Sequence, residues 1–328
     1  VLTAAARARR RFDFAGRVVL VTGGSRGLGL VMARELAREG ARLAVCARDG
    51  AELARARDEL QTNGAEVFDV ICDLRDQSQV NRMIEDVLTR FGRIDVLINN
   101  AGVIQVGPLE VQTQEDFENA MAIHFWAPFY ATQAVLPQMR RQGEGRIVNV
   151  ASIGGKVAVP HLAPYCASKF ALVGLSQALR GELAKDNIFV TTACPGLMRT
   201  GSHINALFKG KNKIEYALFS LMDATPLTSI RAERAARQIL SACRRGDAEL
   251  TITVQAQMAA KINALFPELV AEINGFVSRL LPSGEGGIGT RPAPGKESTS
   301  FASPSILTAL ADSASARNNE LKPNEYLA

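Results

Sequence analysis

Short apolar runs alternate with longer helical patterns from residue 16 to residue 254. Strands are predicted at Val18–Thr22, Arg42–Ala47, Glu66–Cys72, Val96–Asn99, Arg146–Ala151, Phe189–Cys194 and Glu249–Val254. Helices are predicted at 28–39, 50–62, 75–91, 113–141, 163–186 and 232–245. Several of the strands are nearly all apolar, as parallel strands are when both faces of the sheet are covered. The pattern predicts an α/β fold with a doubly wound, seven-stranded parallel sheet and helices on both faces.

The segment 255–282 has a different pattern, an apolar stripe at helical spacing. The stripe consists of Met258, Ile262, Leu265, Phe266, Leu269, Val270, Ile273, Phe276, Val277, Leu280 and Leu281. We therefore expect an amphipathic helical extension in which Pro267 causes a kink or begins a second helix. We expect the stripe to pack against the domain or against a sister subunit. The alternative, contact with a membrane surface, is less favoured because the polar face has few Lys and Arg residues.

The two ends of the chain differ from the domain in composition. Residues 283–303 are rich in Gly, Pro and Ser and predict a linker, after which Ser303-Pro304 begins a short helix through Ile306, Leu307 and Leu310 within 283–328. Residues 1–15 are rich in arginine. A targeting segment would need an apolar or amphipathic stretch before the first strand, so we interpret 1–15 as a solvated basic arm.

Composition excludes several classes of protein. With 328 residues, 47% of them hydrophobic, the chain can bury a sizeable core, and no apolar run approaches the roughly 20 residues of a transmembrane helix. Part of the net charge of +5 comes from the N-terminal arginines, so a nucleic-acid partner has little support. Five scattered cysteines and three dispersed histidines argue against disulfides and against a structural or catalytic metal. They favour a reducing compartment, and we expect a cytoplasmic protein.

A glycine-rich turn follows the first strand and leads into a helix. It reads Thr22-Gly23-Gly24-Ser25-Arg26-Gly27-Leu28-Gly29. Glycines let the backbone approach a pyrophosphate, whose charge is met by amide N–H groups and the positive end of the helix. The spacing is GxxxGxG rather than GxGxxG. Its place after the first strand predicts a dinucleotide site.

The end of the second strand bears on the choice of dinucleotide. Ala47 occupies the position where a carboxylate would bind a ribose 2′-hydroxyl, and Arg48 follows it. Arg48 and Arg26 suit a 2′-phosphate, so we expect NADP. In the alternative, Asp49 binds the ribose and the cofactor is NAD. A third interpretation makes both arginines ordinary surface residues.

Tyr165 and Lys169 are candidates for proton transfer because residues four apart share one helix face. A phenol titrates near 10, and a neighbouring ammonium together with an oxidised nicotinamide would lower its pKa. Tyr165 would then exchange a proton with a carbinol oxygen during hydride transfer. Ser152, just beyond the fifth strand, would hydrogen-bond the substrate carbonyl.

Together these motifs resemble the short-chain dehydrogenase/reductase family over residues 16–254, a single-domain Rossmann-type oxidoreductase. The resemblance implies that Asp73 and Leu74 contact adenine and that Lys169 holds the nicotinamide ribose. It also implies two groups of residues around the cofactor, Asn99, Ala101 and Gly102 in the cleft and Pro195, Gly196 and Thr200 beside the nicotinamide amide. Family members commonly pair the helices near 113–141 and 163–186, which implies a homodimer or homotetramer.

His124 departs from the family pattern, which has an asparagine there that helps to position a water in a proton relay. An imidazole can hold a water and can titrate near neutrality, so a modified relay is our first interpretation. Impaired chemistry and a structural histidine are the alternatives.

The segment between Thr200 and Pro226 corresponds to the substrate lid of the family. Its apolar residues suggest a lipophilic substrate, and Lys209, Lys211 and Lys213 suggest an anionic group. Both sets also fit a simple core with solvated lysines. We expect an NADP(H)-dependent oxidoreductase acting on a ketone, aldehyde or secondary alcohol. The alternative is a dinucleotide-binding scaffold or sensor that acts through its C-terminal extension.

Overall fold

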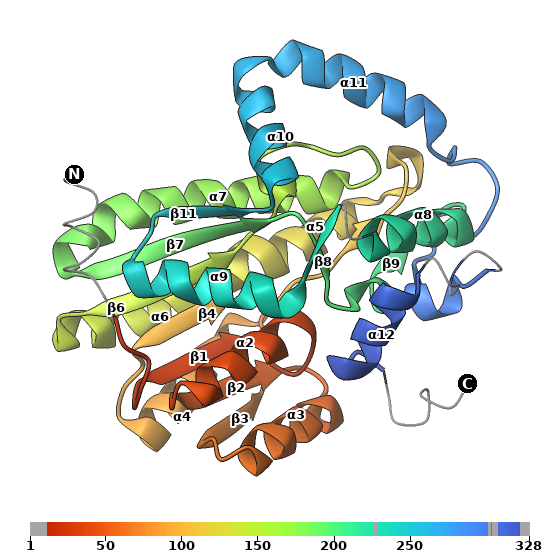
Figure 1. Cartoon of the computed structure of the whole chain (residues 1–328). Coiled ribbons are helices and arrows are strands. Elements are labelled where there is room, and N and C mark those ends of the chain that lie inside the picture. The colour runs from red at the N-terminus through yellow and green to blue at the C-terminus, as the bar shows by residue number, and fades with distance from the viewer. Residues whose placement is uncertain (1–11, 226–227, 301–302, 304–307, 322–328) are drawn as a thin grey trace.

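Seven parallel strands form the central sheet, in the order β11-β7-β6-β4-β1-β2-β3. The computed structural model describes residues 12–225, 228–300, 303 and 308–321 (Figure 1). The strands are β1 (Val18–Thr22), β2 (Arg42–Ala47), β3 (Val67–Ile71), β4 (Val96–Asn99), β6 (Gly145–Val150), β7 (Ile188–Pro195) and β11 (Glu249–Ile252). The predicted doubly wound sheet is confirmed, with every strand at its predicted place.

Helices cover both faces of the sheet because the strand side chains alternate between them. In β1, Val19 and Val21 pack with α2, α3 and α9, whereas Val18 and Leu20 pack with α4, α6 and α7. The helices are α2 (Gly27–Arg38), α3 (Gly50–Thr62), α4 (Gln77–Phe91), α5 (Gln114–Met121), α6 (Ala127–Gln142), α7 (Ala163–Leu183) and α9 (Ala232–Arg245). The helix predicted over 113–141 is helical without a gap from Gln114 to Gln142, and a π-helical segment at Ala122–Trp126 lies between α5 and α6.

The strand order reverses beside β1, which pairs with β2 on one side and with β4 on the other. In an open α/β sheet, the crevice for a ligand lies at the carboxyl ends of the strands at such a switch point. Thr22 and Asn99 end β1 and β4 at that edge. Smaller elements frame it: β5 (Gln105–Val106), β8 (Leu197–Arg199), β9 (Leu207–Phe208), α8 (Asn212–Ala224) and β10 (Ser229–Arg231).

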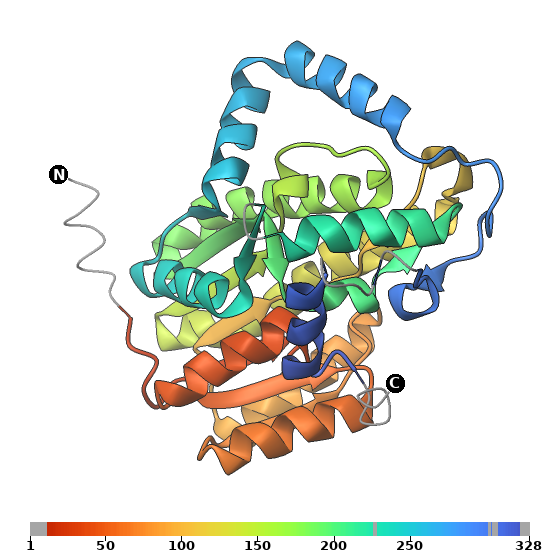
Figure 2. The same cartoon turned by 45° about the vertical axis from the view of Figure 1, so that its right-hand side comes forward.

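The predicted amphipathic extension forms an arm of two helices, α10 (Val254–Leu265) and α11 (Pro267–Leu280), and Pro267 begins the second. The arm arches away from the body (Figures 1 and 2) and its apolar stripe is exposed, for example 71% at Leu265 and 70% at Leu280. The expected packing against the domain is therefore wrong for the described chain. The arm contacts the body through polar bonds, from Asn263 Nδ2 to Lys156 O and from Asn274 Nδ2 to Ala158 O, both 3.0 Å. Packing against a sister subunit stays a prediction.

The segment expected as a linker returns to the body. There β12 (Ala293–Pro294) pairs with β9, and a Cβ on Gly295 would lie 2.1 Å from the His203 carbonyl oxygen. The last described helix is α12 (Ala309–Arg317). Pro304, Ile306 and Leu307 of the expected short helix lie outside the described residues, as does the arginine-rich part of the N-terminal arm. In the described ranges, no helix combines the length and apolarity that a bilayer crossing requires.

Candidate active site

The glycine-rich turn connects β1 to α2 and requires glycine at two positions. Gly23 has φ +64°, and an added Cβ there would lie 2.9 Å from the Cα of Ala101. At Gly29, an added Cβ would lie 2.0 Å from the Gly23 carbonyl oxygen. No side chain within the turn caps α2 at Arg26, and the Gly27 N–H donates to the Asn318 carbonyl oxygen at 2.9 Å. The close glycine turn itself fits a dinucleotide phosphate.

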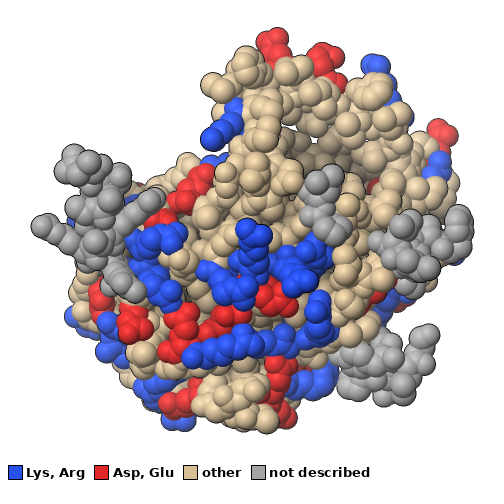
Figure 3. Space-filling view, viewed as in Figure 1, with Lys and Arg blue, Asp and Glu red and all other residues tan. Residues whose placement is uncertain are grey.

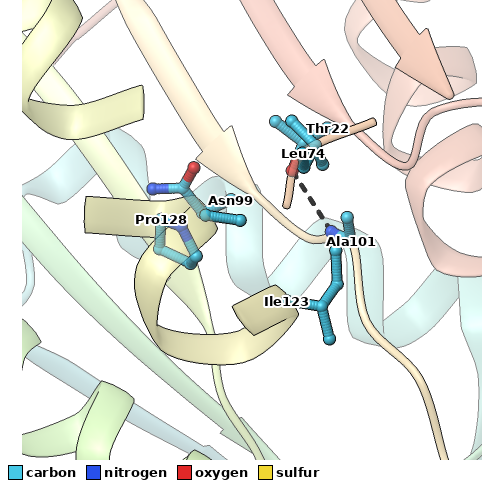
Figure 4. A pocket seen from close by; sticks show the side chains of 7 residues that line it. Thr22, Leu74, Asn99, Ala101, Ile123 and Pro128 are labelled. Atoms are coloured by element: carbon cyan, nitrogen blue, oxygen red, sulfur yellow. Dashed lines mark hydrogen bonds between the residues drawn. The ribbon is translucent and has the colours of Figure 1, made fainter. Parts of the chain in front are cut away.

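The turn is held by the segment after β4. The Asn100 side chain donates to the carbonyl oxygens of Thr22 (3.0 Å) and Gly23 (3.2 Å). The Thr22 hydroxyl accepts hydrogen bonds from the backbone N–H groups of Asn100 (2.9 Å) and Ala101 (3.2 Å; Figure 4). Asn100 was missed as a site residue, although its place in the Asn-Asn-Ala-Gly motif was a signal. It positions the turn.

A small pocket beside these residues is lined by Thr22, Leu74, Asn99, Ala101, Ile123, Ala127 and Pro128 (Figure 4). Within it the Asn99 side chain points away from Ala101, and it donates to Asn149 Oδ1 at 2.8 Å. Asn149 in turn donates to the Ser176 hydroxyl at 3.0 Å. Asn99 thus joins β4 to β6 and α7 through a buried polar chain. The structure gives it a supporting position at the cleft.

The charged side chains at and near the end of β2 each interact with a different protein group. The Asp49 carboxylate caps α3 and accepts from the Glu52 backbone N–H at 3.0 Å. Arg26 pairs with the Glu52 carboxylate at 2.9 Å. Asp73 bonds to Arg75, which lowers the Asp73 pKa, and the positive charge of Arg48 lowers it further. Arg48 and Asp73 therefore lie near one another at this edge.

Ser152, Tyr165 and Lys169 meet where β6 and α7 adjoin. The Ser152 hydroxyl lies near the Tyr165 phenol, close enough to lower its pKa, and accepts a hydrogen bond from the Gly154 N–H at 3.0 Å. The Lys169 ammonium donates to the Val150 carbonyl oxygen at 2.9 Å and lies 5.7 Å from the centre of the Tyr165 ring. Ser152 and Lys169 are buried, and Tyr165 is partly exposed. The structure thus brings together the three side chains that the sequence analysis selected for proton transfer.

Burial dominates the acid–base behaviour of this cluster. It raises the pKa of Tyr165 to about 12, although the nearby Ser152 hydroxyl acts in the opposite direction. Burial also lowers the pKa of Lys169 to about 8. The expected lowering of the Tyr165 pKa is thus not produced by the protein's own groups. Near neutral pH, Tyr165 is a neutral phenol, the form that donates a proton.

His124 lies in the π-helical segment between α5 and α6, with both ring nitrogens bonded to protein groups. The Val103 N–H donates to Nε2 at 3.1 Å, so the ring proton belongs on Nδ1, 2.8 Å from the Ser168 hydroxyl. Ser168 donates to the Tyr165 carbonyl oxygen at 2.8 Å. The His124 ring lies edge-on to the Tyr165 ring at 5.4 Å. The residue therefore supports the start of α7, together with Ser168, which the sequence analysis missed.

The expectation that His124 titrates near neutrality is wrong. Burial and the nearby charge of Lys169 hold its pKa well below the usual value. A neutral ring with both nitrogens occupied by protein groups is poorly placed to hold a relay water.

The lid segment is core in part only, because Leu218, Leu221 and Met222 of α8 are 39%, 42% and 55% exposed. Phe208 and Tyr216 are buried in a small core with Val106 and Ala206. Lys209 is also buried and pairs with Asp116 at 2.5 Å, so it is neither solvated nor free to bind an anionic substrate. Beside the lid, Pro195 ends β7, Gly196 bonds through its N–H to Ile252, and Thr200 is buried.

Comparisons with known proteins agree with this arrangement. The chain is 33% identical over 273 residues to dehydrogenase/reductase SDR family member 7B of Danio rerio, covering 80% of this chain and 86% of that protein. A short chain dehydrogenase/reductase from Burkholderia phymatum in complex with NAD has a TM-score of 0.72 and 25% identity, covering 79% of this chain and 96% of that one. L-Sorbose reductase from Gluconobacter frateurii, complexed with NADPH and L-sorbose, has a TM-score of 0.66 and 27% identity, covering 74% and 97%. Residues 17–207 match the short chain dehydrogenase family, and the chain therefore belongs to this family of oxidoreductases.

Proposed function

We propose that the protein is an NADP(H)-dependent oxidoreductase acting on a lipophilic ketone, aldehyde or secondary alcohol. In the reducing direction, NADPH and a proton convert the carbonyl to an alcohol and leave NADP⁺. The bound nicotinamide supplies or accepts the hydride. The observation that carries the proposal is the placement of Ser152, Tyr165 and Lys169 together, with the Lys169 ammonium held by Val150 and 5.7 Å from the centre of the Tyr165 ring.

Each residue of this cluster has a distinct role in the proposal. The Ser152 hydroxyl orients the substrate oxygen, and Tyr165 donates its proton as negative charge builds there. Lys169, held by the Val150 carbonyl, favours the phenolate that remains and binds the nicotinamide ribose. Pro195, Gly196 and Thr200 flank the nicotinamide amide.

The preference for NADP rests on the end of β2. Arg48 has a guanidinium suited to a 2′-phosphate, and the Asp49 carboxylate already caps α3. These contacts favour Arg48 over Asp49 as the residue that meets the adenosine ribose. A homodimer or homotetramer belongs to the same proposal, supported by Trp126 and Phe170, which are 44% and 41% exposed on the helices that family members pair.

Replacing Tyr165 by Phe tests the proposal. We expect Tyr165→Phe to lower turnover by about 10²–10⁴-fold, because the proton donor is lost, with NADPH binding unchanged. The measurement is substrate-dependent NADPH oxidation at 340 nm, with binding followed by nucleotide fluorescence. Tyr130→Phe, at a tyrosine stacked on Trp126, is the matched control and keeps its turnover. Full activity in Tyr165→Phe would refute the assignment.

One observation favours a second function, a dinucleotide-binding scaffold or sensor. The C-terminal extension bonds directly to the glycine turn, from the Gly27 N–H to the Asn318 carbonyl oxygen at 2.9 Å. NADPH binding without oxidation across a broad panel of carbonyl compounds, and not rescued by His124→Asn, would favour this alternative.

A further inference from the structure

Residues 308–320, called here the strap, lie against the glycine turn. Figures 1 and 2 both show α12 beside α2 and the C-terminal end of the sheet. After α12, the Asn318 carbonyl oxygen accepts from the Gly27 N–H at the start of α2. The Asn319 side chain donates to the carbonyl oxygens of Ser25 (2.8 Å) and Glu52 (3.1 Å). The strap therefore binds the backbone of the turn itself.

Glu320 places a carboxylate at the same point. Its side chain is 3% exposed, lies 3.3 Å from Arg26 Nε, and accepts from Asn205 Nδ2 at 2.7 Å. A Cβ added to Gly27 would lie 2.7 Å from Glu320 Oε1, so the carboxylate touches the glycine that opens α2. A buried carboxyl group beside an arginine at a helix N-terminus stands where a bound phosphate would be held.

The strap also binds the opposite side of the crevice. Asn318 Nδ2 donates to the Thr200 carbonyl oxygen at 3.0 Å, and His203 contacts Asp312 at 3.2 Å. Ser315 packs so closely on Gly201 that a Cβ there would lie 2.4 Å from the Ser315 Cα. The strap thus connects the glycine turn to the residues that follow β8.

We propose that the strap is an autoinhibitory segment that occupies the phosphate position of the dinucleotide site, so that the cofactor binds only after displacing it. The proposal rests on the proposed function. The Gly27 N–H is taken by Asn318, and the Glu320 carboxyl group fills the space beside Gly27 that a pyrophosphate would need. A site that is open for only a fraction of the time has its apparent Kd raised by the inverse of that fraction.

The test compares NADPH binding by the full chain, by a chain ending at residue 307, and by Asn319→Ala. Asn319 has φ +58° and donates one bond to Ser25 in the turn and one to Glu52 in α3, so alanine weakens the strap without changing charge. The control is Asn187→Ala, at an asparagine of φ 55° whose side chain bonds to the Gly143 carbonyl, away from the turn. Binding is measured by calorimetry and folding by circular dichroism.

We expect the shortened chain to bind NADPH at least about tenfold more tightly than the full chain, with Asn319→Ala intermediate and Asn187→Ala unchanged. A synthetic peptide of residues 308–321 should weaken binding by the shortened chain. Equal binding by all forms, or weaker binding by the shortened chain, overturns the strap proposal and leaves the proposed function standing. Folded forms that all fail to bind NADPH and NADH overturn both. If the shortened chain does not fold, Asn319→Ala against Asn187→Ala decides.

Discussion

At the scale of single residues, burial decides what the chemical groups do. Tyr165 keeps its proton because its surroundings disfavour a phenolate, and His124 stays neutral for the corresponding reason. His124 holds Val103 and Ser168 by hydrogen bonds, which makes it a positioning residue for the start of α7. The charges that we propose to distinguish the cofactors lie instead at the exposed end of β2, where Arg48 stands beside the capping Asp49.

Changing Arg48 to Asp tests the choice of cofactor. We expect the ratio of the NADPH and NADH Kd values to shift towards NADH by about 10- to 100-fold, since a charge-assisted bond to the 2′-phosphate is lost and a repulsion is introduced. Fluorescence titrations with both dinucleotides measure this ratio of Kd values. Arg38→Asp, at an exposed arginine paired with Glu35, is the control. An unchanged ratio in Arg48→Asp would place the 2′-phosphate site elsewhere.

At the scale of elements, the connection from β1 to α2 depends on close backbone approach. Gly29 packs against the Gly23 carbonyl, and the Asn100 side chain closes the turn from the β4 side. The two elements therefore form one rigid unit before any ligand binds. The exposed arm of α10 and α11 has no comparable packing, since it meets the body through polar bonds from two asparagines.

Gly29→Ala tests this unit. The added Cβ would meet backbone at 2.0 Å, so we expect roughly 1–3 kcal/mol lower free energy of unfolding, together with weaker NADPH binding. Gly174→Ala is the matched control, because a Cβ there meets nothing within 4 Å in the middle of α7. It should raise the free energy of unfolding by about 0.5–1 kcal/mol. Urea unfolding measures both, and equal effects would contradict the close-approach argument.

At the scale of the whole molecule, His203 joins three distant parts of the chain. It lies after β8, 3.6 Å from Asp223 in α8 and 3.2 Å from Asp312 in α12. The charge of His203 also acts to lower the pKa of Glu320. Burial alone would lower the pKa of His203, but the two aspartates together raise it to about 9. The protonated histidine therefore stabilises the attachment of α12.

This attachment predicts a pH dependence of stability. A folded-state pKa above the unfolded value gives stabilisation that is complete below about pH 6.5 and is lost as the pH rises through about 9. The full loss corresponds to roughly 3 kcal/mol. We expect the free energy of unfolding of the native chain to fall across this window and that of His203→Gln to stay flatter, as measured by urea unfolding at several pH values. Parallel curves for the two proteins would contradict this role.

The amino-acid sequence alone predicted the sheet, the glycine turn and the candidate residues Ser152, Tyr165 and Lys169. It could do so because periodicity, turn chemistry and helix spacing act over a few residues. The π-helical segment at Ala122–Trp126 and the direction of the pKa shift of Tyr165 needed the folded chain, since both depend on packing. The same holds for the exposed arm and for the contact of Asn319 with Ser25, 294 residues apart in the chain. Local sequence patterns indicate which secondary structure each segment prefers. Which segments then share one buried space is settled by tertiary packing, and that packing places the Glu320 carboxyl group at the glycine turn.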